Sequence, residues 1–221
     1  MSSLQDEFDR IALASPDGAT HNEHYHDFLL RQLPSGCDNA LEIGCGTGAF
    51  ARRLAEVSQR VVAIDLSPEM IRLAQQRSAN FVNIEFQLAN IRQVSLPAEG
   101  FDCIASIATL HHLPWNETLL QIKAALAPGG TLLILDLFQA AGWLDALVNL
   151  VAVPMSVGLR LKYQGRVLPR RDERLAWAEH ERHDRYSTMS EVRAICSRIF
   201  PGSRIKQHLL WRYSVVWNKP A

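Results

Sequence analysis

Three glycines at alternate positions, placed directly after a short apolar strand, constrain the fold of this chain more than any other feature. Residues 41–48 read LEIGCGTG, with the glycines at Gly44, Gly46 and Gly48. Glycine permits positive φ and a close approach of the backbone to a ligand, because it carries no Cβ. A helix expected over 49–58 would direct its free N–H groups and its positive dipole end at this loop. The segment therefore predicts a binding site for a nucleotide-like ligand.

Strand-like and helix-like segments alternate regularly from residue 23 to residue 136. Continuous apolar runs without polar alternation are typical of a parallel sheet that is covered on both faces. Their alternation with amphipathic helices predicts a doubly wound α/β fold, with ligands at the carboxyl ends of the strands. We expect strands over 40–43, 61–64, 83–87, 101–107 and 131–135, helices over 23–33, 49–58 and 117–127, a helix that begins at Ser67-Pro68, and a turn at 128–130.

The 221 residues suffice for a single α/β domain with an insertion. We expect an N-terminal helical segment (1–35), a ligand-binding core (36–136), a substrate-side insertion or lid (137–185) and a last helix with two strands (186–221). The apolar stretch at 143–161 carries charges, a proline and a glycine, and its uncharged run is shorter than the roughly 20 residues of a membrane span. A buried or lid-forming helix is expected there, and a solvated, salt-bridged face over 166–185.

Charge and cysteine usage narrow the function classes. Lysine plus arginine and aspartate plus glutamate number 23 each, which argues against a large electrostatic footprint for nucleic acid. The four cysteines are widely spaced, so neither a disulfide framework nor a metal site is expected. The N-terminus is polar and acidic without a secretory signal, which predicts a cytoplasmic protein. No oligomeric state is indicated.

The glycine loop alone is compatible with more than one nucleotide ligand. Gly44, Gly46 and Ala49 satisfy the G-x-G-x-x-A form of the dinucleotide fingerprint, and Asp65 follows about twenty residues on, where a ribose-binding carboxylate belongs. A nicotinamide-dependent oxidoreductase is therefore one reading. It lacks an evident Tyr-x-x-x-Lys pair and does not account for Glu42.

A wider set of motifs distinguishes the readings. In order along the chain these are E-x-G-x-G-x-G at Glu42, Gly44, Gly46 and Gly48, D-x-S-x-x-M at Asp65, Ser67 and Met70, an F-D…H-H-L segment over 101–113, and L-x-P-G-G over 126–130. Together they resemble the class I S-adenosylmethionine-dependent methyltransferases, in particular the small-molecule branch called type 11 or UbiE-like. That resemblance covers residues 41–136 and weakens between 137 and 185. It implies a seven-stranded sheet whose last strand is antiparallel, with the runs at 205–210 and 213–217 supplying strands six and seven.

The resemblance also implies a site for S-adenosyl-L-methionine. The glycine loop would pass under the methionine portion and ribose, Glu42 would attract the α-ammonium group, and Asp65 would accept hydrogen bonds from both ribose hydroxyls. Asparagine at position 90 stands where the family has an aspartate that accepts from the adenine amino group. The remaining residues expected to contact the cofactor are Leu66 and Met70 beside adenine, Ile91 through its backbone N–H, and Ile107.

Methyl transfer needs in-line geometry and the exclusion of water, because the sulfonium is already activated. A general base helps where the acceptor atom carries a proton, and His111 and His112 follow strand four, where the methyl group would lie. No N-P-P-Y segment or Pro-Cys nucleophile follows that strand, which argues against a nucleic-acid substrate. The expected reaction is methylation of a small, apolar or aromatic metabolite at oxygen, carbon or nitrogen. A non-catalytic cofactor-binding module is a further alternative.

Overall fold

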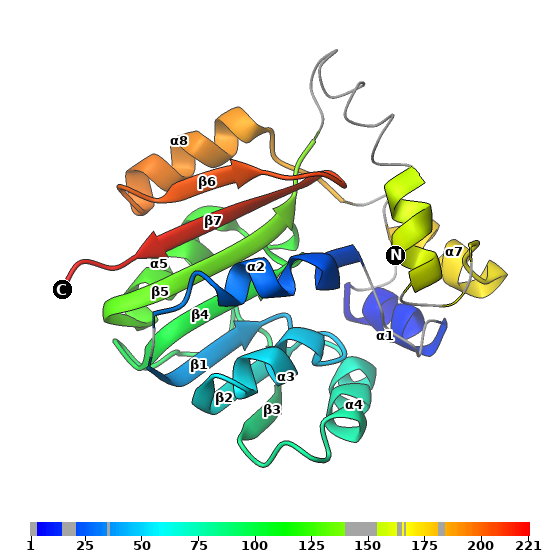
Figure 1. Cartoon of the computed structure of the whole chain (residues 1–221), viewed down its shortest axis with the longest axis horizontal. Coiled ribbons are helices and arrows are strands. Elements are labelled where there is room, and N and C mark those ends of the chain that lie inside the picture. Colours follow the sequence, from blue (N-terminus) through cyan, green and yellow to red (C-terminus); the bar gives the residue numbers. More distant parts are fainter. Residues whose placement is uncertain are drawn as a thin grey trace.

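A seven-stranded sheet forms the centre of the protein (Figure 1). The computed structural model describes residues 4–14, 21–34, 36–139, 154–162, 165, 167–180 and 184–221. Within these, the strands are ordered β3-β2-β1-β4-β5-β7-β6, and β7 alone runs antiparallel to its two neighbours. The strands are β1 (Cys37–Ile43), β2 (Ser58–Asp65), β3 (Ile84–Leu88), β4 (Phe101–Ile107), β5 (Leu126–Leu137), β6 (Arg204–Gln207) and β7 (Arg212–Asn218). The expected doubly wound, mostly parallel sheet is confirmed.

Helices cover both faces of this sheet, which explains why its central strands are apolar without alternation. One core packs strand side chains such as Ile104 and Leu132 against α5 and α8, and the other packs strand side chains such as Ala63 against α2 and α3. The helices are α1 (Leu4–Ala14), η1 (His21–Tyr25), α2 (His26–Leu30), α3 (Ala49–Ala55), α4 (Pro68–Arg77), η2 (Leu110–His112), α5 (Trp115–Ala125), α7 (Arg171–His180) and α8 (Met189–Ile199). Residues 154–162 form a further helix.

Helix α4 begins as its sequence predicts. The Ser67 side chain accepts a hydrogen bond from the Met70 backbone N–H at 3.1 Å, and Pro68 occupies the first helical position. This cap fixes the start of the helix directly after the β2 loop. It therefore also fixes the position of Met70 beside that loop.

Several predicted boundaries differ from the structure. The helix expected over 49–58 ends at Ala55 because Ser58 already begins β2, and the helix expected over 117–127 spans Trp115–Ala125 because Leu126 begins β5. The helix expected over 23–33 is divided into η1 and α2, and its end tightens into i→i+3 bonds from Gln32 N–H to Leu29 O and from Leu33 N–H to Leu30 O. The turn expected at 128–130 lies within β5, because the backbones of Gly129 and Gly130 pair with Lys219 at the end of the chain. The strand expected over 205–210 stops at Gln207, because Leu210 takes a positive φ in the turn before β7.

Helices α1 and α7 lie beyond the carboxyl ends of the parallel strands, on the right in Figure 1. Phe8 of α1 contacts the His180 ring of α7 at 4.8 Å between centroids. Helices α1 and α7 thus cover part of this edge of the sheet. Residues 140–153 of the expected insertion, including Trp143 and Leu147, lie outside the described residues. Among the helices that the structure describes, none is long and apolar enough to cross a membrane.

Candidate active site

A cavity of about 610 Å³ lies at the carboxyl ends of the strands, under α1, α7 and the helix over 154–162. The sequence predicted twelve site residues, and ten of them line this cavity. They are Gly44, Gly46, Asp65, Leu66, Met70, Asn90, Ile91, Ile107, His111 and His112. The structure thus brings eight of the ten predicted cofactor residues and the histidine pair to one continuous space, whereas Glu42 and Gly48 do not line it.

The three glycines of the loop have different reasons to be glycine. All three take positive φ, but a Cβ on Gly44 would lie 2.1 Å from the Thr109 hydroxyl, and a Cβ on Gly48 would lie 3.0 Å from the Phe86 ring. A Cβ on Gly46 would meet nothing within 4 Å. Of these three positions, only Gly46 leaves room for a ligand to approach among the described residues, whereas Gly44 and Gly48 are required by the packing of the loop itself.

Asp65 ends β2 and holds the glycine loop to the next turn. One carboxylate oxygen accepts from the Gly46 backbone N–H at 2.8 Å, and the other accepts from the Ser67 backbone N–H at 2.9 Å. Burial raises the pKa of Asp65, and these backbone N–H groups oppose the shift. The Asp65 carboxylate lines the cavity, and the Leu66 backbone N–H also donates a hydrogen bond to it.

Glu42 is buried behind the same loop. Its side chain borders a second, smaller cavity of about 110 Å³, which shares Gly44, Gly46 and Thr47 with the larger one. Its Oε2 atom has no hydrogen-bond partner among the residues that the structure describes. Burial, reinforced by the charge of Asp65, raises the pKa of the Glu42 carboxyl well above its usual range. An unpartnered buried carboxylate oxygen beside a cavity is suited to a cationic group of a ligand.

The wall beyond the loop is mostly apolar. Leu66 and Met70 border the cavity from one side, and Ile91 from the other. The Asn90 side-chain oxygen accepts from the Arg92 backbone N–H at 3.0 Å, so part of its accepting capacity is already used within its own turn. This wall can hold a flat ring, with Asn90 at its edge.

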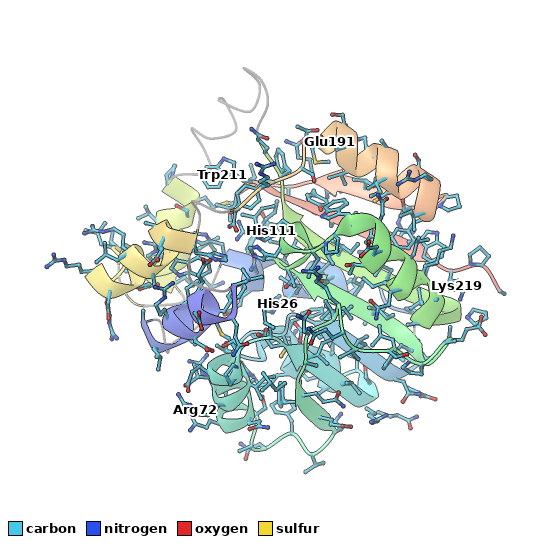
Figure 2. The ribbon with its side chains drawn as sticks, turned by 180° about the vertical axis from the view of Figure 1, so that it is seen from behind. His26, Arg72, His111, Glu191, Trp211 and Lys219 are labelled. Carbon is cyan, nitrogen blue, oxygen red and sulfur yellow. The ribbon has the colours of Figure 1, made fainter. Side chains whose placement is uncertain are left out.

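His111 and His112 lie at the far end of the cavity, on the short helix η2, and Figure 2 shows His111 beside the end of the sheet. The His111 Nδ1 lies 2.6 Å from the Asp136 carboxylate, which also accepts from the His111 backbone N–H at 3.0 Å. The His112 Nδ1 lies 3.2 Å from Asp184. Burial lowers the pKa of His112, and the contact with Asp184 opposes that shift.

Sequence reasoning missed several residues at this end. They are Asp136 on β5, His180 on α7, Asp184 just after α7, and Arg212 on β7. Each of them is buried or half-buried. The interpretation of residues 166–185 as a solvated face is wrong in part, because the side of α7 that carries Glu173, Trp177 and His180 faces the cavity. The signals available were an acid at the end of strand five and the i,i+4 spacing of His180 and Asp184.

The antiparallel β7, the glycine loop after β1 and the carboxylate that ends β2 define a Rossmann-like α/β enzyme fold of the methyltransferase class. Solved structures have the same fold. The chain is similar to a Haloferax volcanii putative methyltransferase that was solved in complex with the activator Trm112. The TM-score is 0.70 at 17% identity, and the match covers 99% of this chain and 100% of that one. The chain is also similar to the N-methyltransferase NodS of Bradyrhizobium japonicum, in complex with S-adenosylhomocysteine, with a TM-score of 0.65 at 22% identity over 98% of each chain.

Comparison with known protein sequences shows the family to which this chain belongs. A family model described as a methyltransferase domain matches residues 40–130. An uncharacterised methyltransferase of Mycobacterium bovis is 31% identical over 202 residues, covering 90% of this chain and 96% of its own length. A ubiquinone biosynthesis O-methyltransferase of Xanthomonas campestris is 30% identical over 49% of this chain and 46% of its own length. The chain belongs to the class I S-adenosylmethionine-dependent methyltransferases, and the resemblance found in the sequence is confirmed.

Proposed function

We propose that this enzyme transfers the methyl group of S-adenosyl-L-methionine to a small, apolar or aromatic metabolite bound at the His111–His112 end of the 610 Å³ cavity. The observation that carries this proposal is the continuity of the cavity from the Asp65 loop to the histidine pair. A volume of this size lies within the roughly 300–1,000 Å³ of small-molecule sites. Methyl donor and acceptor would share one space, as in-line transfer requires.

The residues at the loop fit this cofactor. Asp65 would accept the ribose hydroxyls, Glu42 would face the α-ammonium group through the smaller cavity, and Gly46 leaves room for close approach. The unpartnered Glu42 oxygen supports this placement, because a buried carboxylate gains most from a cationic partner. The cofactor supplies an activated methyl group, and the chain supplies orientation and exclusion of water.

The other end of the cavity supports a small apolar or aromatic acceptor. Phe8, Leu159, Trp177 and Trp211 line the cavity and come from four separate segments. A cavity of this kind, lined mostly by apolar side chains, favours a metabolite over nucleic acid, which needs an extended basic groove. His111 and His112 would contact the acceptor and take up its proton where the acceptor atom carries one.

The two alternatives have less support. Family membership decides against a nicotinamide-dependent oxidoreductase. A non-catalytic module would fill its acceptor site with its own side chains, whereas the described residues leave this space open.

The proposal is tested by following S-adenosylhomocysteine formation with phenols, quinols, aromatic acids and amines, and with RNA and protein in parallel. Leu159→Trp would fill the cavity and is expected to lower kcat/KM for the acceptor at least about tenfold. Leu161→Trp is the matched control, because Leu161 lies on the same helix with 53% exposure. Equal effects of both variants, or turnover with RNA or protein alone, would contradict the proposal.

A further inference from the structure

We infer that His111, His112 and Asp184 form a binding site for a divalent transition-metal ion that prefers nitrogen and oxygen ligands, of the Zn²⁺ or Fe²⁺ class. The sequence predicted no metal site. The inference rests on the geometry of these three side chains, and metal binding does not depend on the proposed methyl acceptor.

The three side chains converge from two segments far apart in sequence. Each offers one ligand atom, and these atoms all lie within 4.8 Å of one another. The His112 Nδ1 is 3.2 Å from one Asp184 oxygen, and the His111 Nε2 is 3.9 Å from the other. Two ligands on one tetrahedral ion, with bonds of about 2.0–2.2 Å, stand about 3.3–3.6 Å apart. The observed spacings bracket that value.

The orientation of His111 is that of a metal ligand. Its Nδ1 lies 2.6 Å from Asp136, a carboxylate that also accepts from the backbone N–H groups of His111 and Leu137. A neutral ring that donates from Nδ1 to this carboxylate carries its lone pair on Nε2, the nitrogen that faces Asp184. A carboxylate behind the remote nitrogen is the usual arrangement that fixes the tautomer of a metal-bound histidine.

A second carboxylate–histidine pair stands beside the proposed site. The His180 Nδ1 lies 3.1 Å from Glu7, and its Nε2 lies 3.7 Å from Asp184. Tyr186 donates a hydrogen bond to the same Asp184 oxygen at 2.7 Å. The Tyr186 hydrogen bond holds Asp184 in place, and His180 lies next to the same oxygen, so we assign His180 a positioning role rather than that of a ligand.

Two imidazole nitrogens that face one carboxylate make a donor set that a cation can bridge once His112 presents an unprotonated Nδ1. Imidazole suits Zn²⁺ and Fe²⁺, whereas Mg²⁺ prefers oxygen ligands. Three protein ligands leave a further coordination position open, as in catalytic rather than structural metal sites. All three line the large cavity, where an ion would polarise an acceptor hydroxyl. That last role rests on the proposed function and would make His111 and His112 ligands instead of bases.

Titration of the chelator-treated protein with Zn²⁺ by calorimetry, and with Co²⁺ by visible absorption, tests the inference. We expect one equivalent per chain and the visible bands of Co²⁺ with nitrogen and oxygen ligands, and no binding of Mg²⁺. Asp184→Asn and His112→Gln should each weaken Zn²⁺ binding at least about tenfold, and His180→Gln should weaken it less.

His24→Gln is the matched control, because His24 is exposed and far from the cluster in sequence. Retained S-adenosylhomocysteine affinity in each variant shows that the fold and the cofactor site are intact, separately from any methyl transfer. The inference is overturned if the parent chain binds no Zn²⁺. It is also overturned if Asp184→Asn and His112→Gln both bind Zn²⁺ as His24→Gln does.

Discussion

The Ser67 hydroxyl donates a hydrogen bond to the Asp9 carboxylate of α1 while it caps α4 by accepting from the Met70 backbone N–H. The Ser67 backbone N–H in turn donates to Asp65. The N-terminal helix is thereby joined to the loop that would hold the cofactor ribose. Glu7, on the same helix, reaches His180 of α7 at the other end of the cavity. Helix α1 thus contacts both ends of the site.

Removing the Asp9 carboxylate should loosen this cover. Asp9→Ala loses the bond from Ser67 and the weaker one from the Glu69 backbone N–H, so we expect a loss of about 1–2 kcal/mol in unfolding free energy and faster hydrogen exchange over 4–14. Arg10→Ala is the control, since its ion pair with Glu179 is 3.2 Å long and solvent-exposed and should contribute little. Unchanged exchange in Asp9→Ala would show that α1 is held by other contacts.

Asp65 should matter for cofactor affinity beyond its role in bracing the loop. Asp65→Asn keeps one acceptor oxygen but loses the charge and is expected to weaken S-adenosylhomocysteine binding more than about tenfold by calorimetry. Asp102→Asn provides the comparison, because Asp102 also accepts from two backbone N–H groups, of Asp38 and Asn39, at the start of β4. If both variants weaken binding equally, Asp65 acts through the fold alone.

Glu42→Gln should raise the stability of the protein and lower its affinity for the cofactor. The raised pKa of Glu42 means that the folded state holds its proton above the pH at which the unfolded chain releases it, so stability falls as pH rises above about 4.5. A neutral glutamine avoids this loss, and we expect a higher unfolding free energy at pH 7.5 with a smaller gain near pH 5. Cofactor affinity should fall at the same time, because the ammonium group loses its anionic partner. A stable variant with unchanged affinity would remove Glu42 from the cofactor site.

The buried His26 side chain should make the unfolding free energy of the protein sensitive to acid. Burial, with a smaller contribution from Arg53, lowers its pKa from 6.5 to about 4. Between these values the unfolded chain binds a proton that the folded chain does not, so stability is lost as pH falls, by up to about 3 kcal/mol. His26→Phe keeps the ring contact with Phe50 and should flatten the dependence of unfolding free energy on pH between 7.5 and 4.5. An identical slope in both proteins would contradict this assignment.

The sheet could be predicted from the sequence because its signals are local. The apolar runs at 61–64 and 101–107 identify buried strands by their lack of alternation, and Ser67-Pro68 marks a helix start by cap chemistry alone. The ends of strands were predicted wrongly where the residues that pair with them lie far away in the sequence. Gly129 lies in a strand because it meets Lys219, and no local pattern contains that information.

The cofactor end of the site was predictable for the same reason, since it follows two adjacent strands. The histidine end was not, because Asp184 and His180 reach His112 across about 70 residues of chain. Their charges appear in the sequence as part of a balanced polar run. Only the packing of α7 against α1 turns one side of that run toward the cavity.

Calorimetric titration with S-adenosylhomocysteine, with NAD and NADP in parallel, is the most direct test of whether this site binds S-adenosylmethionine. We expect micromolar binding of S-adenosylhomocysteine at one site per chain, weakened in Asp65→Asn, and no heat from either nicotinamide cofactor. Binding of NAD or NADP in place of S-adenosylhomocysteine, or of none of the three, would contradict this expectation.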